Sequence, residues 1–124
     1  MTAPQIYLVD DNAINVELVE FVLGSAGFSV ESTTRAEQAL DAIRSAPPDL
    51  VLMDIQMPGL DGLELTRRLK NDPSTRHVRI VAFTAYAMKG DQQKMLEAGC
   101  DGYIAKPIEV ATFAATVPSL IRPR

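Results

Sequence analysis

The feature that most constrains the fold of this chain is a set of four short apolar runs separated by stretches of helical periodicity. The runs occupy residues 6–9, 50–53, 80–83 and 103–105. Each run is continuous rather than alternating, which is typical of strands that helices cover on both faces. A weaker alternating stretch at residues 28–30 predicts an additional strand at an edge of the sheet.

The segments between the runs have the apolar spacing of helices. The first predicted helix spans residues 14–23, and its apolar face consists of Ile14, Leu18, Phe21 and Val22. Thr34 and Glu37 have the spacing of a capping box, which predicts the start of a second helix. The prolines at 47–48 end that helix, because proline removes a backbone donor.

Three further helices are predicted, which span residues 61–71, 91–98 and a region beginning near Glu109. Asp61, followed by Glu64, is expected to cap the first of them, and Asp91 the second. Pro118 should kink the last helix or end it early. Strands and helices therefore alternate along the whole chain, and this order predicts a parallel sheet between two layers of helices.

Composition narrows the class of protein. The 124 residues and 13.5 kDa fit a single domain over 1–124, and 47% hydrophobic with 23% charged residues is ordinary for a globular domain. The net charge of -4, with no cluster of basic residues, argues against nucleic-acid binding. A single cysteine, Cys100, excludes an intrachain disulfide framework, and a single histidine, His77, excludes a histidine pair as metal ligands.

The same sequence predicts a cytoplasmic protein without membrane insertion. It has no run of about 18 apolar residues. The amino-terminal residues lack the basic flank of a signal peptide.

Polar residues follow the apolar runs directly, at the edge where the carboxyl ends of parallel strands meet. Asp10 and Asp11 follow the first run, Asp54 the second, Thr84 the third and Lys106 the fourth. Three close carboxylates repel one another unless a cation compensates, and Mg²⁺ prefers oxygen ligands. A lysine ammonium is suited to a phosphoryl oxygen. These residues predict a site for phosphate together with Mg²⁺.

In their order and placement these residues resemble a response-regulator receiver domain of the CheY-like family. The matching pieces are residues 8–12, 52–59, 83–85 and 103–107, and the resemblance covers essentially the whole chain. It implies a flavodoxin-like, doubly wound sheet of five parallel strands in the order 2-1-3-4-5, with five helices. The chain is also similar to stand-alone cell-division regulators of the DivK type and to receivers of hybrid histidine kinases.

The resemblance assigns a role to each acidic residue of the site. Asp54 corresponds to the phosphoacceptor, which takes a phosphoryl group from a partner's phosphohistidine. Asp10 and Asp11 correspond to the acidic pair that holds Mg²⁺ together with Asp54 and the backbone carbonyl of Gln56. The side chains of Gln56 and Tyr86 stand at positions that tune the lifetime of the phosphate.

The resemblance also implies a switch. Lys106 would bind a phosphoryl oxygen, and Pro107 matches a proline that is often cis. Thr84 and Tyr103 correspond to the switch pair, in which the hydroxyl moves toward the phosphate and the aromatic ring enters the vacated space. The surface of the fourth helix, fifth strand and fifth helix would change as a result. The implied partners are a histidine kinase or histidine phosphotransfer protein and a downstream protein target.

Other interpretations explain some of the same residues. Asp10, Asp11 and Asn12 are all residue types that cap helices, and Tyr103 fits a packed aromatic without a switching role. Other classes are a flavin-binding carrier, a small Mg²⁺-dependent phosphohydrolase that would use Asp10, and a pseudo-receiver that binds partners without phosphate.

The final helical region has an unusual lack of charge. No charged residue lies between Glu109 and Arg122, which leaves a smooth strip of Thr112, Ala115, Thr116 and Ser119. This strip predicts docking of a kinase or a weak homodimer. An uncharged short helix without a partner explains the composition equally well.

Overall fold

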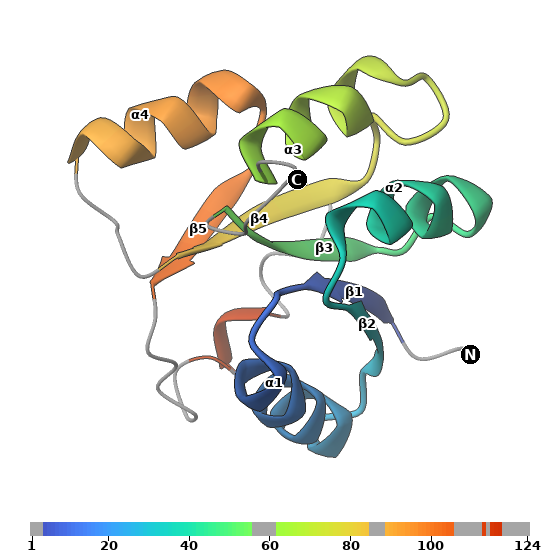
Figure 1. Cartoon of the computed structure of the whole chain (residues 1–124). Coiled ribbons are helices and arrows are strands. Elements are labelled where there is room, and N and C mark those ends of the chain that lie inside the picture. Colours follow the sequence, from blue (N-terminus) through green and yellow to red (C-terminus); the bar gives the residue numbers. More distant parts are fainter. Residues whose placement is uncertain (1–3, 56–61, 85–88, 106–112, 114, 118–124) are drawn as a thin grey trace.

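Five strands alternate with helices along the chain (Figure 1). This computed structural model describes residues 4–55, 62–84, 89–105, 113 and 115–117. Residues 113 and 115–117 are also helical. The elements are β1 (Gln5–Val9), α1 (Ala13–Ser25), β2 (Ser29–Thr33), α2 (Ala36–Ser45), β3 (Leu50–Asp54), α3 (Gly62–Asn71), β4 (Arg79–Thr84), α4 (Lys89–Ala98) and β5 (Gly102–Ala105).

The strands form one parallel sheet in the order β2-β1-β3-β4-β5. This order confirms the predicted flavodoxin-like topology, in which the chain starts at the interior strand β1, adds the edge strand β2 on one side and then β3, β4 and β5 on the other. Figure 1 shows α1 and the helical segment at 113–117 on one side of the sheet, and α2, α3 and α4 on the other. In this order β2 is an edge strand, as predicted.

Each continuous apolar run contributes side chains to two hydrophobic cores, one on each face of the sheet. In β1, Tyr7 and Val9 pack toward α2 and α3, whereas Ile6 and Leu8 pack toward α1. The second core also includes Phe83 of β4 and Phe113, whose stacked rings have centroids 6.1 Å apart. Burial on both faces therefore explains why the runs do not alternate.

The predicted core face of α1 is wrong except at Val22. The helix buries Val16, Val19, Val22 and Leu23, whereas the predicted residues Ile14, Leu18 and Phe21 are exposed. Both faces of this helix carry apolar residues at helical spacing, so periodicity alone cannot identify the inner face. Docking against the sheet selects the valine face.

The predicted capping box at the start of α2 is also wrong. The N-cap is Arg35, which makes no side-chain cap hydrogen bond, and Thr34 does not take that place. Instead, the Thr33 hydroxyl accepts from the Arg35 N–H at 3.1 Å and lies 3.1 Å from Oε1 of Gln38. Because β2 pairs with β1 through Thr33, the chain turns after that residue and the helix begins later than a cap at Thr34 requires.

The predicted start of α4 differs from the observed one. Asp91 is the third residue of α4 rather than its cap, because the helix begins at Lys89. Asp61, Glu109 and Pro118 lie outside the described residues. Within the described parts of the chain, no helix is both long enough and apolar enough to cross a membrane.

Gly62, the first residue of α3, lies against the end of β3. A Cβ atom at this position would meet the backbone carbonyl oxygen of Asp54 and would lie 2.8 Å from the Cα of Ile55. Only glycine lets the helix approach the strand end this closely. Gly24 in α1 is different, because a Cβ there would have no atom within 4 Å.

We expect Gly62→Ala to lower the free energy of unfolding by about 1–3 kcal/mol, since the added methyl group must displace backbone. Gly24→Ala is the matched control and should raise stability by up to about 1 kcal/mol, because alanine favours helix over glycine. Urea denaturation followed by circular dichroism measures both. Equal effects of the two substitutions would contradict the close approach.

Candidate functional site

Three carboxylates converge at the carboxyl edge of the sheet. Asp10 and Asp11 follow β1 directly, and Asp54 is the last residue of β3. The two strands are neighbours and pair Val9 with Met53, which brings their ends together. One carboxylate oxygen from each aspartate lies within 4.8 Å of the other two. The structure thus brings together the three acidic residues that the sequence placed at strand ends.

Burial makes the negative charges of this cluster unfavourable. The exposed fractions of Asp10 and Asp54 are 0% and 2%, whereas Asp11 is exposed to solvent. Buried carboxylates lose hydration, and negative charges held close together repel one another. A cation placed among them would offset both effects.

The amino-terminal end of α1 borders the cluster and has its own cap. Oδ1 of Asn12 accepts from the N–H groups of Ile14 at 2.9 Å and Asn15 at 3.2 Å. Oδ1 of Asp10 accepts from the Asn12 N–H at 2.9 Å, which ties the turn to the carboxylate. The capping interpretation therefore holds for Asn12. Its cap orients the start of α1, whose partial positive charge lies beside the acids.

The donor set fits a hard divalent cation. All three candidate ligands are carboxylate oxygens, and Mg²⁺ takes such oxygens in an octahedral shell at about 2.0–2.1 Å. Ligands of that shell lie about 3–4 Å apart, so a set within 4.8 Å needs only small inward movements. One exposed carboxylate, Asp11, leaves the cluster open to water on one side.

For Thr84 only the backbone position is described, and four other predicted site residues are not described. The backbone of Thr84 ends β4, one residue beyond the Asp54–Phe83 pair, so it reaches the same edge of the sheet. Gln56, Tyr86, Lys106 and Pro107 lie outside the described residues.

Tyr103 lies in β5, where it pairs with Ala82 of β4. Its side chain is 44% exposed, which is high for an aromatic ring in a sheet. The ring is therefore not fully packed against its neighbours, and its part in the switch stays a prediction. An exposed ring on this strand is compatible with the predicted switch.

The sequence reading missed the contribution of α3 to the site. The absence of a side chain at Gly62 lets α3 lie against the Asp54 backbone, and the buried Thr66 hydroxyl donates to the Gly62 carbonyl at 2.9 Å. The sequence predicts no role for Gly62, although a glycine directly after a predicted cap residue is a usable signal for a close backbone approach.

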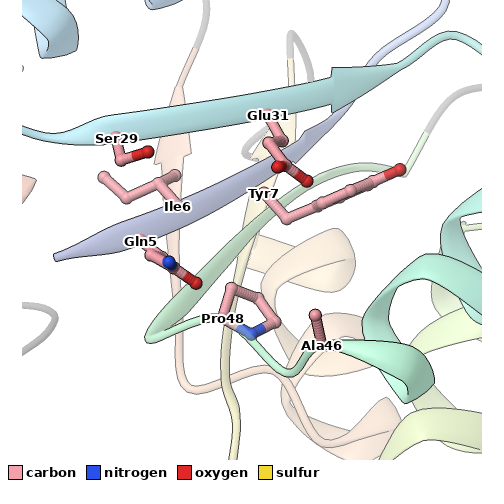
Figure 2. A pocket seen from close by; sticks show the side chains of 7 residues that line it. All are labelled: Gln5, Ile6, Tyr7, Ser29, Glu31, Ala46 and Pro48. Atoms are coloured by element: carbon pink, nitrogen blue, oxygen red, sulfur yellow. The ribbon is translucent and has the colours of Figure 1, made fainter.

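A pocket of about 130 Å³ lies at the amino ends of β1 and β2, away from the acidic cluster. It is lined by Gln5, Ile6, Tyr7, Ser29, Glu31, Ala46 and Pro48. Figure 2 shows Tyr7 and Glu31 projecting to the same side of the two strands. Burial, and then the charge of Glu31, raise the pKa of Tyr7. The pocket lacks the convergent charged groups of the carboxylate cluster, so we assign the chemistry to the cluster.

Known proteins resemble this chain in sequence and in fold. DivK, a polar-differentiation response regulator of Brucella anthropi, is 41% identical over 116 residues, which are 94% of each chain. The receiver domain of the sensor histidine kinase PA1611 from Pseudomonas aeruginosa is 34% identical with a TM-score of 0.88, covering 97% of this chain and 98% of that one. Its crystal structure has a magnesium ion coordinated in the active-site cleft.

A CheY-like receiver domain protein from Methanospirillum hungatei has a TM-score of 0.88 and 25% identity, with 97% of this chain and 94% of that one covered. The family profile described as the response regulator receiver domain matches residues 6–117, which include all three clustered aspartates. A flavin carrier or a phosphohydrolase of similar architecture does not explain this match. The chain belongs to the response-regulator receiver domain family of two-component signalling.

Proposed function

We propose that this receiver domain, spanning residues 1–124, is a signalling switch that is phosphorylated on Asp54. The observation that carries the proposal is the position of this buried carboxylate, within 4.8 Å of two further carboxylates at the end of a central strand. The donor is the phosphohistidine of a histidine kinase or a histidine phosphotransfer protein. An Asp54 carboxylate oxygen attacks phosphorus, the P–N bond breaks as the P–O bond forms, and the leaving imidazole takes up a proton.

The chain's own residues prepare this transfer. Asp10, Asp11, Asp54 and the Gln56 backbone carbonyl would hold Mg²⁺. When bound, the metal offsets the negative charge that the carboxylate and the phosphoryl oxygens share. Lys106 supplies a second positive charge at a phosphoryl oxygen. The domain promotes its own phosphorylation and dephosphorylation, but its product is a changed protein surface.

The change of surface follows from residues on β4 and β5. The Thr84 hydroxyl would move toward the phosphate, and the exposed ring of Tyr103 would turn inward to fill the space. The outer surface of α4, β5 and the final helix would then present a different shape to a downstream protein. Gln56 and Tyr86 would set how fast water removes the phosphate, and Pro107 corresponds to the family's proline that is often cis.

The similarity to DivK supports a role in signalling that controls polar differentiation and the cell cycle. We place the protein in the cytoplasm, with kinase and target proteins as partners and without nucleic-acid binding. The similarity to a receiver within a sensor histidine kinase means that the same transfer chemistry also suits a domain of a longer protein.

Incubation with acetyl phosphate and Mg²⁺ should add one phosphoryl group to the wild-type chain, as measured by intact mass. Asp54→Asn should abolish the adduct, because the amide is not a nucleophile, and chelation of the metal should reduce it. Asp41→Asn, an exposed acid on α2, is the control and should be labelled normally. An adduct that survives in Asp54→Asn but is lost in Asp10→Asn would instead support the phosphohydrolase class.

We expect Asp10→Asn to stabilise the metal-free protein by about 1–3 kcal/mol, because it removes a buried charge close to two others. The asparagine oxygen can still accept from the Asn12 N–H. Mg²⁺ should stabilise the wild-type chain but not the variant. Thermal and urea unfolding with and without Mg²⁺ measure this, with Asp41→Asn as control. A destabilised Asp10→Asn variant would contradict the electrostatic account.

Phosphorylation should shield the Tyr103 ring, which is 44% exposed in this structure. Relaxation of the tyrosine ring protons by a soluble paramagnetic agent measures exposure directly. The effect on Tyr103 should fall after treatment with acetyl phosphate and Mg²⁺, while the buried Tyr7 should not change. An unchanged Tyr103 signal in fully phosphorylated protein would rule out its part in the switch.

A further inference from the structure

The pocket at the amino ends of β1 and β2 lies at the opposite edge of the sheet from the three carboxylates. Because α2 ends at Ser45, the chain passes these two strands as a loop and leaves a hollow of about 130 Å³. Its walls are side chains on one face of the two strands and in that loop, mainly Gln5, Tyr7, Ser29, Glu31, Ala46 and Pro48. We call this hollow the β1–β2 pocket.

The β1–β2 pocket has an acidic character. Among the described residues that line it, Glu31 alone is charged, and its side chain is exposed. A second carboxylate, Asp49, is close by, because it accepts from the Gln5 N–H at 2.7 Å. No basic side chain in the described ranges forms an ion pair with Glu31, and Arg44 in the last turn of α2 is held by Asp72 at 2.8 Å. An uncompensated carboxylate that borders a pocket attracts a cation.

An aromatic side chain borders the same space. Tyr7 is 7% exposed, and Figure 2 shows the Glu31 carboxylate beside it. Burial first, and then the charge of Glu31, raise the pKa of Tyr7, so its hydroxyl keeps its proton and the ring stays neutral. A neutral ring next to a carboxylate suits a planar cation, which can stack on the ring while it donates to the carboxylate.

The size of the β1–β2 pocket limits the ligand to a small group. A water molecule takes about 30 Å³ of the liquid, so the pocket holds on the order of four non-hydrogen atoms. A guanidinium group is of this size and is planar, and its N–H groups lie in the plane. The Glu31 carboxylate, the Gln5 amide oxygen and the Ser29 hydroxyl can all accept from it. An ammonium group is more strongly hydrated and has no plane to stack, so it fits less well.

We propose that the β1–β2 pocket is a binding site for a guanidinium group. The group stacks on the Tyr7 ring, donates to the Glu31 carboxylate and is held further by Gln5 and Ser29. Its source is an arginine side chain of a partner protein or a free guanidino compound, which share this recognition chemistry. The inference is independent of the proposed phosphorylation of Asp54, because the pocket lies at the other end of the strands.

The test uses ethylguanidinium as the probe and ethylurea as its matched control, because ethylurea has nearly the same shape without the charge. Binding to the whole 124-residue chain is followed by NMR of its amide and tyrosine ring signals. Ethylguanidinium should shift the signals of Tyr7, Glu31 and their neighbours, with a Kd on the order of 1 mM for so small a group. Ethylurea should bind about tenfold more weakly, since hydrogen bonds between charged groups are stronger than neutral ones.

Two variants locate the charge that matters. Glu31→Gln should weaken the binding of ethylguanidinium by about tenfold, because the amide keeps the size of the side chain and removes its charge. Glu37→Gln is the matched control, since Glu37 is an exposed acid in the first turn of α2 outside the pocket, and it should bind as the wild-type chain does.

A capped arginine, acetyl-arginine-methylamide, distinguishes the two sources. Binding as tight as that of ethylguanidinium would support an arginine side chain of a partner protein. Binding about tenfold weaker would support a free guanidino compound, because the peptide groups would then obstruct entry.

Three results would overturn the inference. The first is unchanged Tyr7 and Glu31 signals at a probe concentration about tenfold above that Kd. The second is equal binding of ethylurea, or equal binding to Glu31→Gln, which would leave Glu31 only the role of keeping an edge strand from pairing. The third is a set of shifts confined to the surroundings of Asp10, Asp11 and Asp54, since the cation would then bind the acidic cluster.

Discussion

The side-by-side pairing of β1 and β3 in the middle of the sheet is the interaction on which the rest of the structure depends. It brings two strand ends together and buries Asp10 and Asp54 next to the exposed Asp11. Burial and like charge both oppose this arrangement, so the two apolar cores that hold the strands must also hold the carboxylates in place. A cation would relieve that opposition, which gives a physical reason for the proposed coupling of metal binding to phosphoryl transfer.

Helix α1 connects this site to the molecular surface. Its capped end borders the turn that carries Asp10 and Asp11, its inner valines pack in one core, and its outer face exposes Ile14, Leu18 and Phe21. On the other side of the sheet, the glycine at the start of α3 allows the helix to touch the strand that ends in Asp54. Two helices on opposite faces of the sheet therefore border one site.

Much of this arrangement could be predicted from the residues. Continuous apolar runs identified the buried strands because burial on both faces removes the need for polar residues, and the acids were placed correctly because parallel strands end at a common edge. The wrong predictions for the inner face of α1 and the cap of α2 have the same cause. Ile14 and Phe21 fit the helical period as well as Val16 and Val19, and Thr34 has the spacing of a cap although Arg35 takes that position. Local patterns left these pairs equal, and contact with distant strands decided between them.

The sequence by itself determined the alternation of strands and helices and the residue types at each strand end, because burial and backbone chemistry act locally along the chain. It carried the receiver resemblance for the same reason. Only the tertiary structure decided which face of α1 points inward, where α2 and α4 begin, and that Gly62 must lack a side chain. Those properties depend on the distance between segments far apart in the chain, and no local pattern contains that distance.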